Sequence, residues 1–183
     1  MRFLFRLTVI LGVLAFGTVV LGNLAERWVI YPFDSTEASP HDAGLERVDQ
    51  IQFENDNETL IAWVAKPKAG KPVIFYLHGN AGNLAARAGR FDRFISRGYG
   101  LFAPAYRGSS GSSGSPSEAA LIWDVETTYH AMFQHFPDLT SRQVVLYGES
   151  LGAAVTIALL NTPAMHPDKA FGPPAATVLK RRA

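Results

Sequence analysis

Hydrophobic positions along this chain form one long block at the N-terminus and then a series of short runs that change period. Residues 7–25 include no charged side chain, and about 20 apolar residues span a bilayer core as a helix. Arg2 and Arg6 precede the block, so residues 1–27 are predicted to be a membrane anchor or a cleaved signal sequence. The anchor is favoured because Asn23-Leu24-Ala25 lacks the small-x-small pattern of a cleavage site. As a single-pass anchor, this segment would leave the rest of the chain on the extracytoplasmic side.

After this block the pattern predicts a linker followed by β-strands. Residues 28–47 hold proline, serine, aspartate and glycine without periodicity, as in a linker. Val48–Phe53 and Leu60–Val64 are β-like runs, and Asn55-Asp56-Asn57 between them favours the turn of a hairpin. Pro72–Leu77 is a continuous apolar run, which is typical of a strand buried on both faces of a parallel sheet.

Between Leu84 and Leu160, helical and strand-like periods alternate. Ser115-Pro116-Ser117-Glu118 has the sequence of a capping box with proline at the first helical position, which predicts where one helix begins. Just before it, Gly108–Gly114 has the composition of a flexible linker, but its place between a strand and a helix favours a native loop. The predicted order is helix, strand, helix, strand and helix, over residues 84–97, 99–105, 115–136, 144–147 and 151–160.

This alternation predicts an α/β fold. Each strand–helix–strand crossover is expected to be right-handed, which gives a parallel sheet covered by helices on both faces. The domain of residues 48–160 is therefore expected to be a β-hairpin followed by a three-layer α/β/α sandwich. Residues 161–183 are predicted to be an irregular tail, because their prolines interrupt any helix.

Composition narrows the classes of function. Lysine and arginine total 17 and aspartate and glutamate 16, giving a net charge of +1 without a basic stripe; nucleic acid is therefore not expected as a partner. The chain contains no cysteine, which excludes disulfides, iron–sulfur clusters and thiolate-bound zinc. No glycine-rich segment is followed by Gly-Lys-Ser/Thr, so nothing predicts a phosphate-binding loop. Neither a cofactor nor a metal is implied.

Two motifs with possible chemistry follow predicted strands. Gly148-Glu149-Ser150-Leu151-Gly152 is a G-x-S-x-G sequence between a predicted strand and a predicted helix. In that context the serine lies on a sharp strand-to-helix turn, with its hydroxyl exposed for nucleophilic attack. His78-Gly79-Asn80-Ala81-Gly82-Asn83 directly follows the first strand predicted for the parallel sheet. Acyl transfer needs two N–H donors for the oxyanion, and the backbone groups of Asn80 and Leu151 are the candidates.

The order and spacing of these blocks resemble the α/β-hydrolases, in particular the membrane-anchored branch often called serine-aminopeptidase-like or α/β-hydrolase-domain proteins. The resemblance implies an incomplete α/β-hydrolase fold with Ser150 as the nucleophile and the backbone N–H groups of Asn80 and Leu151 as the oxyanion hole. One departure is Ala105, where the family commonly has an aspartate before a Tyr-Arg-Gly block. The resemblance covers residues 27–160 and rests on WVIY at 28–31, VIFYLHGNAGN at 73–83, GYG at 98–100, YRG at 106–108, GSPSE at 114–118 and YGESLG at 147–152.

The family's triad acid and histidine lie on later loops, for which this chain offers no clear equivalent. Only 33 residues (183 − 150) follow Ser150. They include His166 and Asp168, which come in the reverse order and two residues apart in a proline-broken tail, so neither is expected to serve Ser150. His78 is expected to shape its own loop, because its ring would compete for the space of the oxyanion turn. The favoured hypothesis is a truncated hydrolase of reduced or absent activity, with an exposed hydrophobic strand at 144–147.

Three functional hypotheses follow from the sequence. The first is a serine hydrolase that cleaves an ester, thioester or amide of a small-molecule, acyl or peptide substrate by nucleophilic acyl transfer to water. The second is a non-catalytic, membrane-tethered binding module that retains the hydrolase pocket. The third is a half-domain that a second chain completes.

Overall fold

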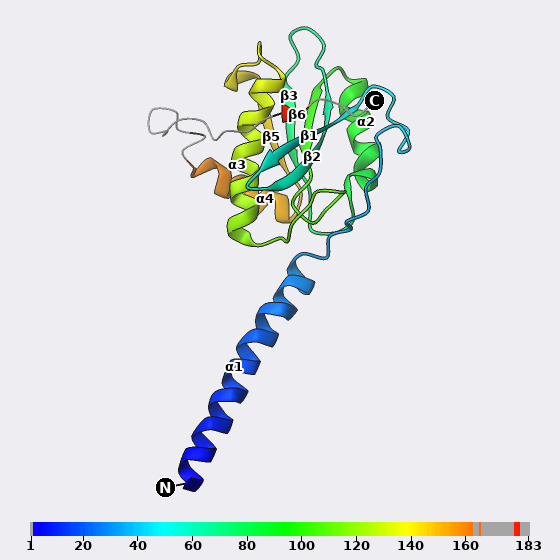
Figure 1. Cartoon of the computed structure of the whole chain (residues 1–183). Helices are drawn as coiled ribbons and strands as arrows, with labels where there is room; N and C mark the ends of the chain where they lie inside the picture. The colour runs from blue at the N-terminus through cyan, green and yellow to red at the C-terminus, as the bar shows by residue number, and fades with distance from the viewer. Residues whose placement is uncertain (1, 163–164, 166–177, 180–183) are drawn as a thin grey trace. The chain divides into compact units, whose positions relative to one another are not determined.

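The computed structural model describes residues 2–162, 165, 178 and 179, and the chain divides into two compact units after residue 32. The first unit holds one helix, α1 (Arg2–Ile30), which contains the apolar window Phe5–Gly22 (Figure 1). This window is long and apolar enough to cross a membrane, and a signal sequence would meet the same criterion. The apolar N-terminal helix is thus confirmed, whereas its role as an anchor or a signal stays a prediction.

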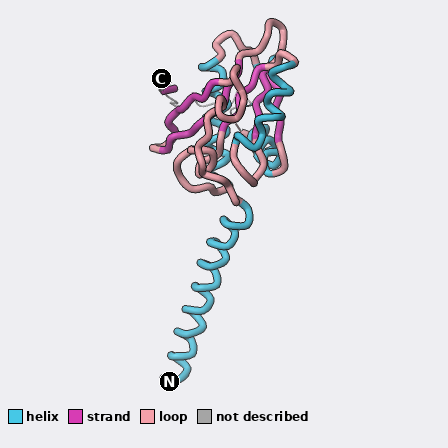
Figure 2. Tube along the Cα trace, turned by 90° about the vertical axis from the view of Figure 1, so that its right-hand side faces the viewer, coloured by secondary structure: helices cyan, strands magenta, loops and turns pink. Residues whose placement is uncertain are grey.

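The second unit is built around one mixed sheet. Its strands are β1 (Asp49–Asn55), β2 (Glu58–Ala65), β3 (Val73–Leu77), β4 (Gly100–Pro104), β5 (Val144–Gly148) and β6 (Val178–Leu179), in the spatial order β5-β3-β4-β2-β1-β6. β3 pairs in parallel with both β4 and β5, whereas β2 pairs antiparallel with both β1 and β4. β6 lies beside β1 at one end of the sheet (Figure 2). The predicted hairpin and parallel sheet are both confirmed.

The hairpin turn consists of the two residues between β1 and β2. Asn55 pairs with Glu58 at the end of the ladder, and the intervening Asp56 and Asn57 have φ angles of 49° and 64°. Positive φ at both central positions is typical of the type I′ turn, whose twist matches that of the flanking strands, and Asp and Asn tolerate that conformation. The turn is therefore determined by local sequence.

Helices cover both faces of the sheet, as the alternation of periods predicts. Phe75 and Tyr76 are consecutive in β3, so their side chains point to opposite faces. The helices of this unit are η1 (Leu84–Arg87), α2 (Ala88–Ser96), α3 (Glu118–His135), η2 (Ser141–Gln143) and α4 (Leu151–Leu160). The Phe75 ring meets Tyr129 of α3 at a centroid distance of 5.5 Å, and the Tyr76 ring meets Phe91 of α2 at 5.0 Å. α2 therefore covers one face, with α3 and α4 on the other (Figure 1).

The start of α3 differs from the prediction. The helix begins at Glu118 with Ser117 as its N-cap, and the Ser117 hydroxyl accepts a hydrogen bond from the Ala120 N–H at 3.3 Å. Pro116 is therefore outside the helix, and the predicted start at the proline is wrong by two residues. The preceding loop turns back on itself, because the Gly108 N–H donates to the Ser112 and Ser113 carbonyl oxygens (3.1 and 3.0 Å).

The glycine- and serine-rich loop at residues 108–114 is an integral part of the domain. The Ser112 hydroxyl accepts a hydrogen bond from the Ile61 N–H at 2.9 Å, and the Ser113 hydroxyl accepts one from the Thr59 N–H at 2.8 Å. These serines therefore satisfy backbone donors of β2 that would otherwise lack a partner. The native-loop interpretation is confirmed.

The end strand β5 exposes an apolar surface. It pairs with β3 on one side, and none of the described strands pairs with its other side. Val145 and Tyr147 are 45% and 37% exposed, so the predicted hydrophobic edge is confirmed within the part of the chain that the structure describes. At the opposite end of the sheet, Val178 and Leu179 form β6, although this segment was predicted to be irregular. The two residues pair with Phe53 and Gln52, and that tertiary pairing orders them.

Candidate active site

Ser150 lies on a strained turn between β5 and α4. Its φ and ψ angles are 51° and −115°, a combination that residues with a Cβ rarely adopt. The side chain is exposed, as the G-x-S-x-G motif predicts for a nucleophile held above the sheet. Backbone strain of about 1–3 kcal/mol persists only where the surrounding structure over-determines it, and such sites are often functional.

Two glycines make this turn possible by letting backbones approach closely. A Cβ placed on Gly152 would lie 2.0 Å from the Leu77 carbonyl oxygen, and one placed on Gly148 would lie 2.5 Å from the Gly152 carbonyl oxygen. No side chain fits at either distance. Both glycines of the motif are therefore required by packing, because α4 begins directly against the end of β3.

The loop after β3 packs directly against the Ser150 turn. The Glu149 N–H donates to the Leu77 carbonyl oxygen at 2.9 Å, and a Cβ placed on Gly79 would lie 3.5 Å from the Ser150 Cβ. The loop that carries Asn80 and the helix start that carries Leu151 are thus neighbours of Ser150. Among the described residues, neither the Asn80 nor the Leu151 N–H donates a hydrogen bond. Both remain candidate oxyanion donors.

His78 is fully buried beneath this loop. Its Nε2 atom accepts from the Tyr106 backbone N–H at 3.4 Å, so its Nδ1–H donates to the Gly79 carbonyl oxygen at 2.7 Å. The rings of Phe33 and Tyr106 lie against it. Burial lowers the pKa of His78 from 6.5 to about 4, so the imidazole is neutral at pH 7. These contacts agree with a histidine that shapes its loop.

The sequence comparisons find relatives for most of the chain. Protein bem46 of Schizosaccharomyces pombe is 30% identical over 158 residues, which cover 80% of this chain and 52% of that protein. The α/β-hydrolase domain-containing protein WAV2 of Arabidopsis thaliana is 29% identical over 169 residues, covering 86% of this chain and 53% of that protein. An uncharacterized membrane protein of Saccharomyces cerevisiae is 30% identical over 152 residues, covering 78% and 53%. No protein-family model matches the chain.

Solved structures share the fold. An α/β-hydrolase from Vibrio vulnificus has a TM-score of 0.60 at 19% identity, covering 69% of this chain and 44% of that one. An esterase from Pyrococcus furiosus has a TM-score of 0.57 at 22% identity, covering 71% and 51%. The chain belongs to the α/β-hydrolase superfamily. It spans about half the length of the curated relatives named above.

A charged network that the sequence did not predict braces the Ser150 turn of this α/β-hydrolase. The Glu149 carboxylate accepts hydrogen bonds from the Tyr76 hydroxyl and from Arg87 Nε (3.4 Å), and it forms an ion pair with Arg90 (2.9 Å). Arg87 Nη1 also donates to the Asn83 carbonyl oxygen at 2.9 Å. Arg87 is buried. Its guanidinium therefore links the loop after β3 to the residue that precedes Ser150.

The same network fixes the charge of Glu149. Burial opposes ionisation, but the Tyr76 hydroxyl and the Arg87 and Arg90 guanidinium groups outweigh it and hold the pKa of Glu149 below its ordinary value. The Tyr76 hydroxyl is partly buried beside that carboxylate, and its pKa is raised. Glu149 is thus an anion paired with two cations at pH 7, which suits a structural carboxylate better than a proton acceptor.

A base for Ser150 is missing from the described part of the chain. Within that part, the Ser150 hydroxyl makes no hydrogen bond to a histidine or to any other residue. His166 and Asp168 lie outside the described residues. No group of three or more His, Asp or Glu side chains in the described part could hold a metal ion. The described residues therefore supply a candidate nucleophile and two candidate oxyanion donors.

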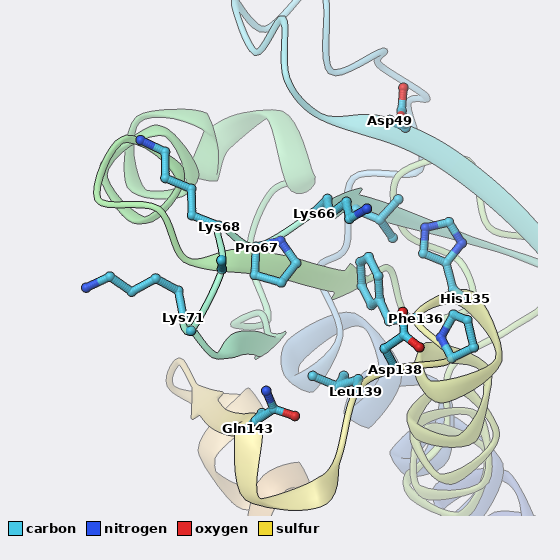
Figure 3. Close-up of a pocket in the computed structure, with 14 residues that line it drawn as sticks. Asp49, Lys66, Pro67, Lys68, Lys71, His135, Phe136, Asp138, Leu139 and Gln143 are labelled. Carbon is cyan, nitrogen blue, oxygen red and sulfur yellow. The ribbon is translucent and has the colours of Figure 1, made fainter.

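A pocket of about 540 Å³ lies away from Ser150, at the opposite ends of strands β3 and β5 (Figure 3). Two of its lining residues lie just before parallel strands: Lys71 is two residues before the start of β3, and Gln143 directly precedes β5. Ser150, by contrast, follows the other end of β5. Figure 3 shows Lys68 and Lys71 extending away from His135 and Phe136. This pocket is therefore not part of the candidate active site.

Proposed function

We propose that this α/β-hydrolase is a serine hydrolase in which Ser150 attacks the carbonyl carbon of an ester, thioester or amide. The observation that carries the proposal is the backbone of Ser150, which has a φ of 51° directly between β5 and α4. This backbone conformation is higher in free energy than an ordinary one, and the close packing at Gly148 and Gly152 maintains it. Such a turn pre-organises a nucleophile above the sheet. The fold it shares with an esterase is consistent with ester cleavage.

The proposed reaction has two halves. Ser150 Oγ bonds to the carbonyl carbon and loses its proton to a base, and the resulting oxyanion is stabilised by the Asn80 and Leu151 N–H groups. The alcohol, thiol or amine then leaves with a proton, giving an acyl-serine. A water molecule attacks this acyl group, and Ser150 recovers its proton as the carboxylic acid departs. Loss of the base alone can lower kcat by about 10⁶-fold, while oxyanion stabilisation keeps some rate.

The lack of a hydrogen-bonded base among the described residues favours a second candidate function. In that case the chain is a binding module that holds an acyl compound at the same turn without turning it over. The packing of the loop after β3 against the start of α4 supports this alternative, because it brings the candidate donors Asn80 and Leu151 beside Ser150 without involving a base.

We also infer that α1 anchors the chain as a single pass, with the hydrolase domain on the extracytoplasmic side. The apolar window Phe5–Gly22 and the preceding Arg2 and Arg6 support this orientation. The intact mass of the purified chain distinguishes an anchor from a signal: an anchor leaves residues 1–27 in place, and their loss would overturn the proposal.

A fluorophosphonate probe tests the function directly. The full chain in detergent micelles is expected to gain one covalent adduct, located at Ser150 by mass spectrometry. Ser150→Ala should abolish the adduct, whereas Ser141→Ala, at an exposed serine in η2, should leave it unchanged. If the native chain is not labelled, the serine-hydrolase proposal fails and the binding module becomes the better description. An adduct that persists in Ser150→Ala would assign the nucleophile elsewhere.

A further inference from the structure

A second, smaller pocket opens beside the Ser150 turn. Its volume is about 370 Å³, which lies in the range of small-ligand sites. Its polar lining consists almost entirely of arginine. The lining residues are Ala81, Ala86, Arg87, Gly89, Arg90, Arg93 and Glu149.

The pocket carries surplus positive charge. Three arginines and one glutamate line it, so the formal charge of the lining is +2 (3 − 1). Glu149 does not offer a free carboxylate to a cation, since Tyr76, Arg87 and Arg90 already donate to it. The remaining positive charge of the lining is therefore not neutralised by a carboxylate of the pocket wall.

Arg93 supplies much of that surplus. It lies on α2 one turn beyond Arg90 and is exposed, and its side chain makes no hydrogen bond or ion pair with any residue that the structure describes. A guanidinium presents a planar fork of donors that suits the oxygens of a carboxylate or phosphate. Arg90, one-third exposed and fixed by Glu149, lies in the same pocket lining.

The pocket borders both parts of the candidate active site. Ala81 directly follows Asn80 in the loop after β3, and Glu149 directly precedes Ser150. We propose that this pocket binds an anionic group, a carboxylate or a phosphate, carried by the substrate whose acyl bond is cleaved at Ser150. The inference rests on the proposed function for the role of the anion, while the anion site itself stands on the arginine lining. It assigns Arg93 as a residue that selects acidic substrates.

Direct titration tests the site without requiring turnover. The full chain in micelles of a nonionic detergent is titrated by calorimetry with inorganic phosphate and, in a separate series, with acetate. The native chain is expected to bind at least one of them saturably at a 1:1 ratio, with affinity falling as chloride rises. Arg93→Gln should weaken binding by about tenfold or more, as expected for loss of one charge-assisted hydrogen bond. The matched control is Arg97→Gln, which removes an exposed arginine beyond the end of the same helix and outside the pocket lining.

The outcomes separate the two proposals. Preference for phosphate or for acetate identifies the class of anion, and either supports the site. Absence of saturable binding to the native chain, or equal losses in Arg93→Gln and Arg97→Gln, would overturn it. Ser150→Ala is expected to bind the anion as the native chain does while losing the fluorophosphonate adduct. Anion binding without any adduct would therefore retain the pocket and reject the hydrolase.

Discussion

Replacing Asp124 with alanine is expected to destabilise the hydrolase domain by about 4 kcal/mol. Asp124 is buried on α3, where its carboxylate accepts from both Arg107 Nε (2.6 Å) and Arg107 Nη2 and from Asn55 Nδ2 (2.7 Å). The side chains of Arg107 and Asp124 are only 13% and 2% exposed. Truncation would leave a guanidinium and an amide without their acceptor in an interior that water barely reaches.

The magnitude follows from these contacts. Breaking a buried ion pair by removing one partner costs about 3–5 kcal/mol, and the lower end applies because Arg107 retains some solvent contact. The unpaired Asn55 amide adds about 1 kcal/mol. Asp124→Asn keeps an acceptor oxygen and is expected to lose about half as much. Against a typical domain stability of about 5–15 kcal/mol, the alanine variant is close to unfolding.

Urea unfolding of the full chain in micelles, followed by tryptophan fluorescence, measures the effect. Asp138→Ala, at an exposed aspartate, serves as the matched control and should change stability by less than about 0.5 kcal/mol. The double variant Arg107→Met/Asp124→Leu removes both charges. Its loss of stability should be clearly smaller than the sum of the losses measured for Arg107→Met and Asp124→Leu separately. Additive losses would refute the coupling, and a native-like Asp124→Ala would refute the buried pair altogether.

Two further predictions concern the loops after β3 and β5. Gly152→Ala should cost about 3 kcal/mol and abolish probe labelling, because its Cβ would lie 2.0 Å from the Leu77 carbonyl oxygen; Gly89→Ala, where nothing lies within 4 Å, should be neutral or stabilising. Since the folded pKa of His78 is lowered to about 4 from 6.5, the unfolded chain takes up its proton first as the pH falls. Stability should therefore drop by about 2 kcal/mol between pH 7 and pH 5, measured by urea midpoints. His78→Gln should flatten that part of the pH profile; an unchanged profile would contradict the assignment.

The elements that the sequence predicts well are those whose cause is local. The five residues of β3 are all buried and apolar, so the continuous run Val73–Leu77 specifies its own environment. The hairpin turn needs two residues that tolerate positive φ, and Asp56 and Asn57 are adjacent in the chain. The Ser150 turn is similarly encoded, because the two glycines that permit it lie two residues on either side.

Features that depend on distant partners could not be predicted. The capping-box sequence predicts a helix that begins at Pro116, whereas Ser117 is the N-cap of α3 and its hydroxyl accepts from the Ala120 N–H. Glu149 and Arg87 are 62 residues apart, and only the position of Glu149 inside the motif hinted at a role. Ala105 indicates a loop without the carboxylate that the family commonly has there. Arg107, two residues later, instead donates a hydrogen bond to the carboxylate of Asp124 on α3.

The contacts of the Ser150 turn show which parts of the chain build the candidate site. The Glu149 N–H donates to the Leu77 carbonyl oxygen of β3 at 2.9 Å. The Gly152 N–H donates to the Glu149 carbonyl oxygen and the Ala153 N–H to the Ser150 carbonyl oxygen, each at 2.8 Å. Arg87 ties the same turn to the loop after β3. Every one of these contacts lies between residues 77 and 153, so none of them uses a segment after α4. The proposed attack by Ser150 also requires a base, and none of the residues in these contacts supplies one. In the proposed function, the geometry of the Ser150 turn and the capacity for turnover therefore have separate origins. This separation is why labelling of Ser150 and binding of an anion are proposed as independent measurements.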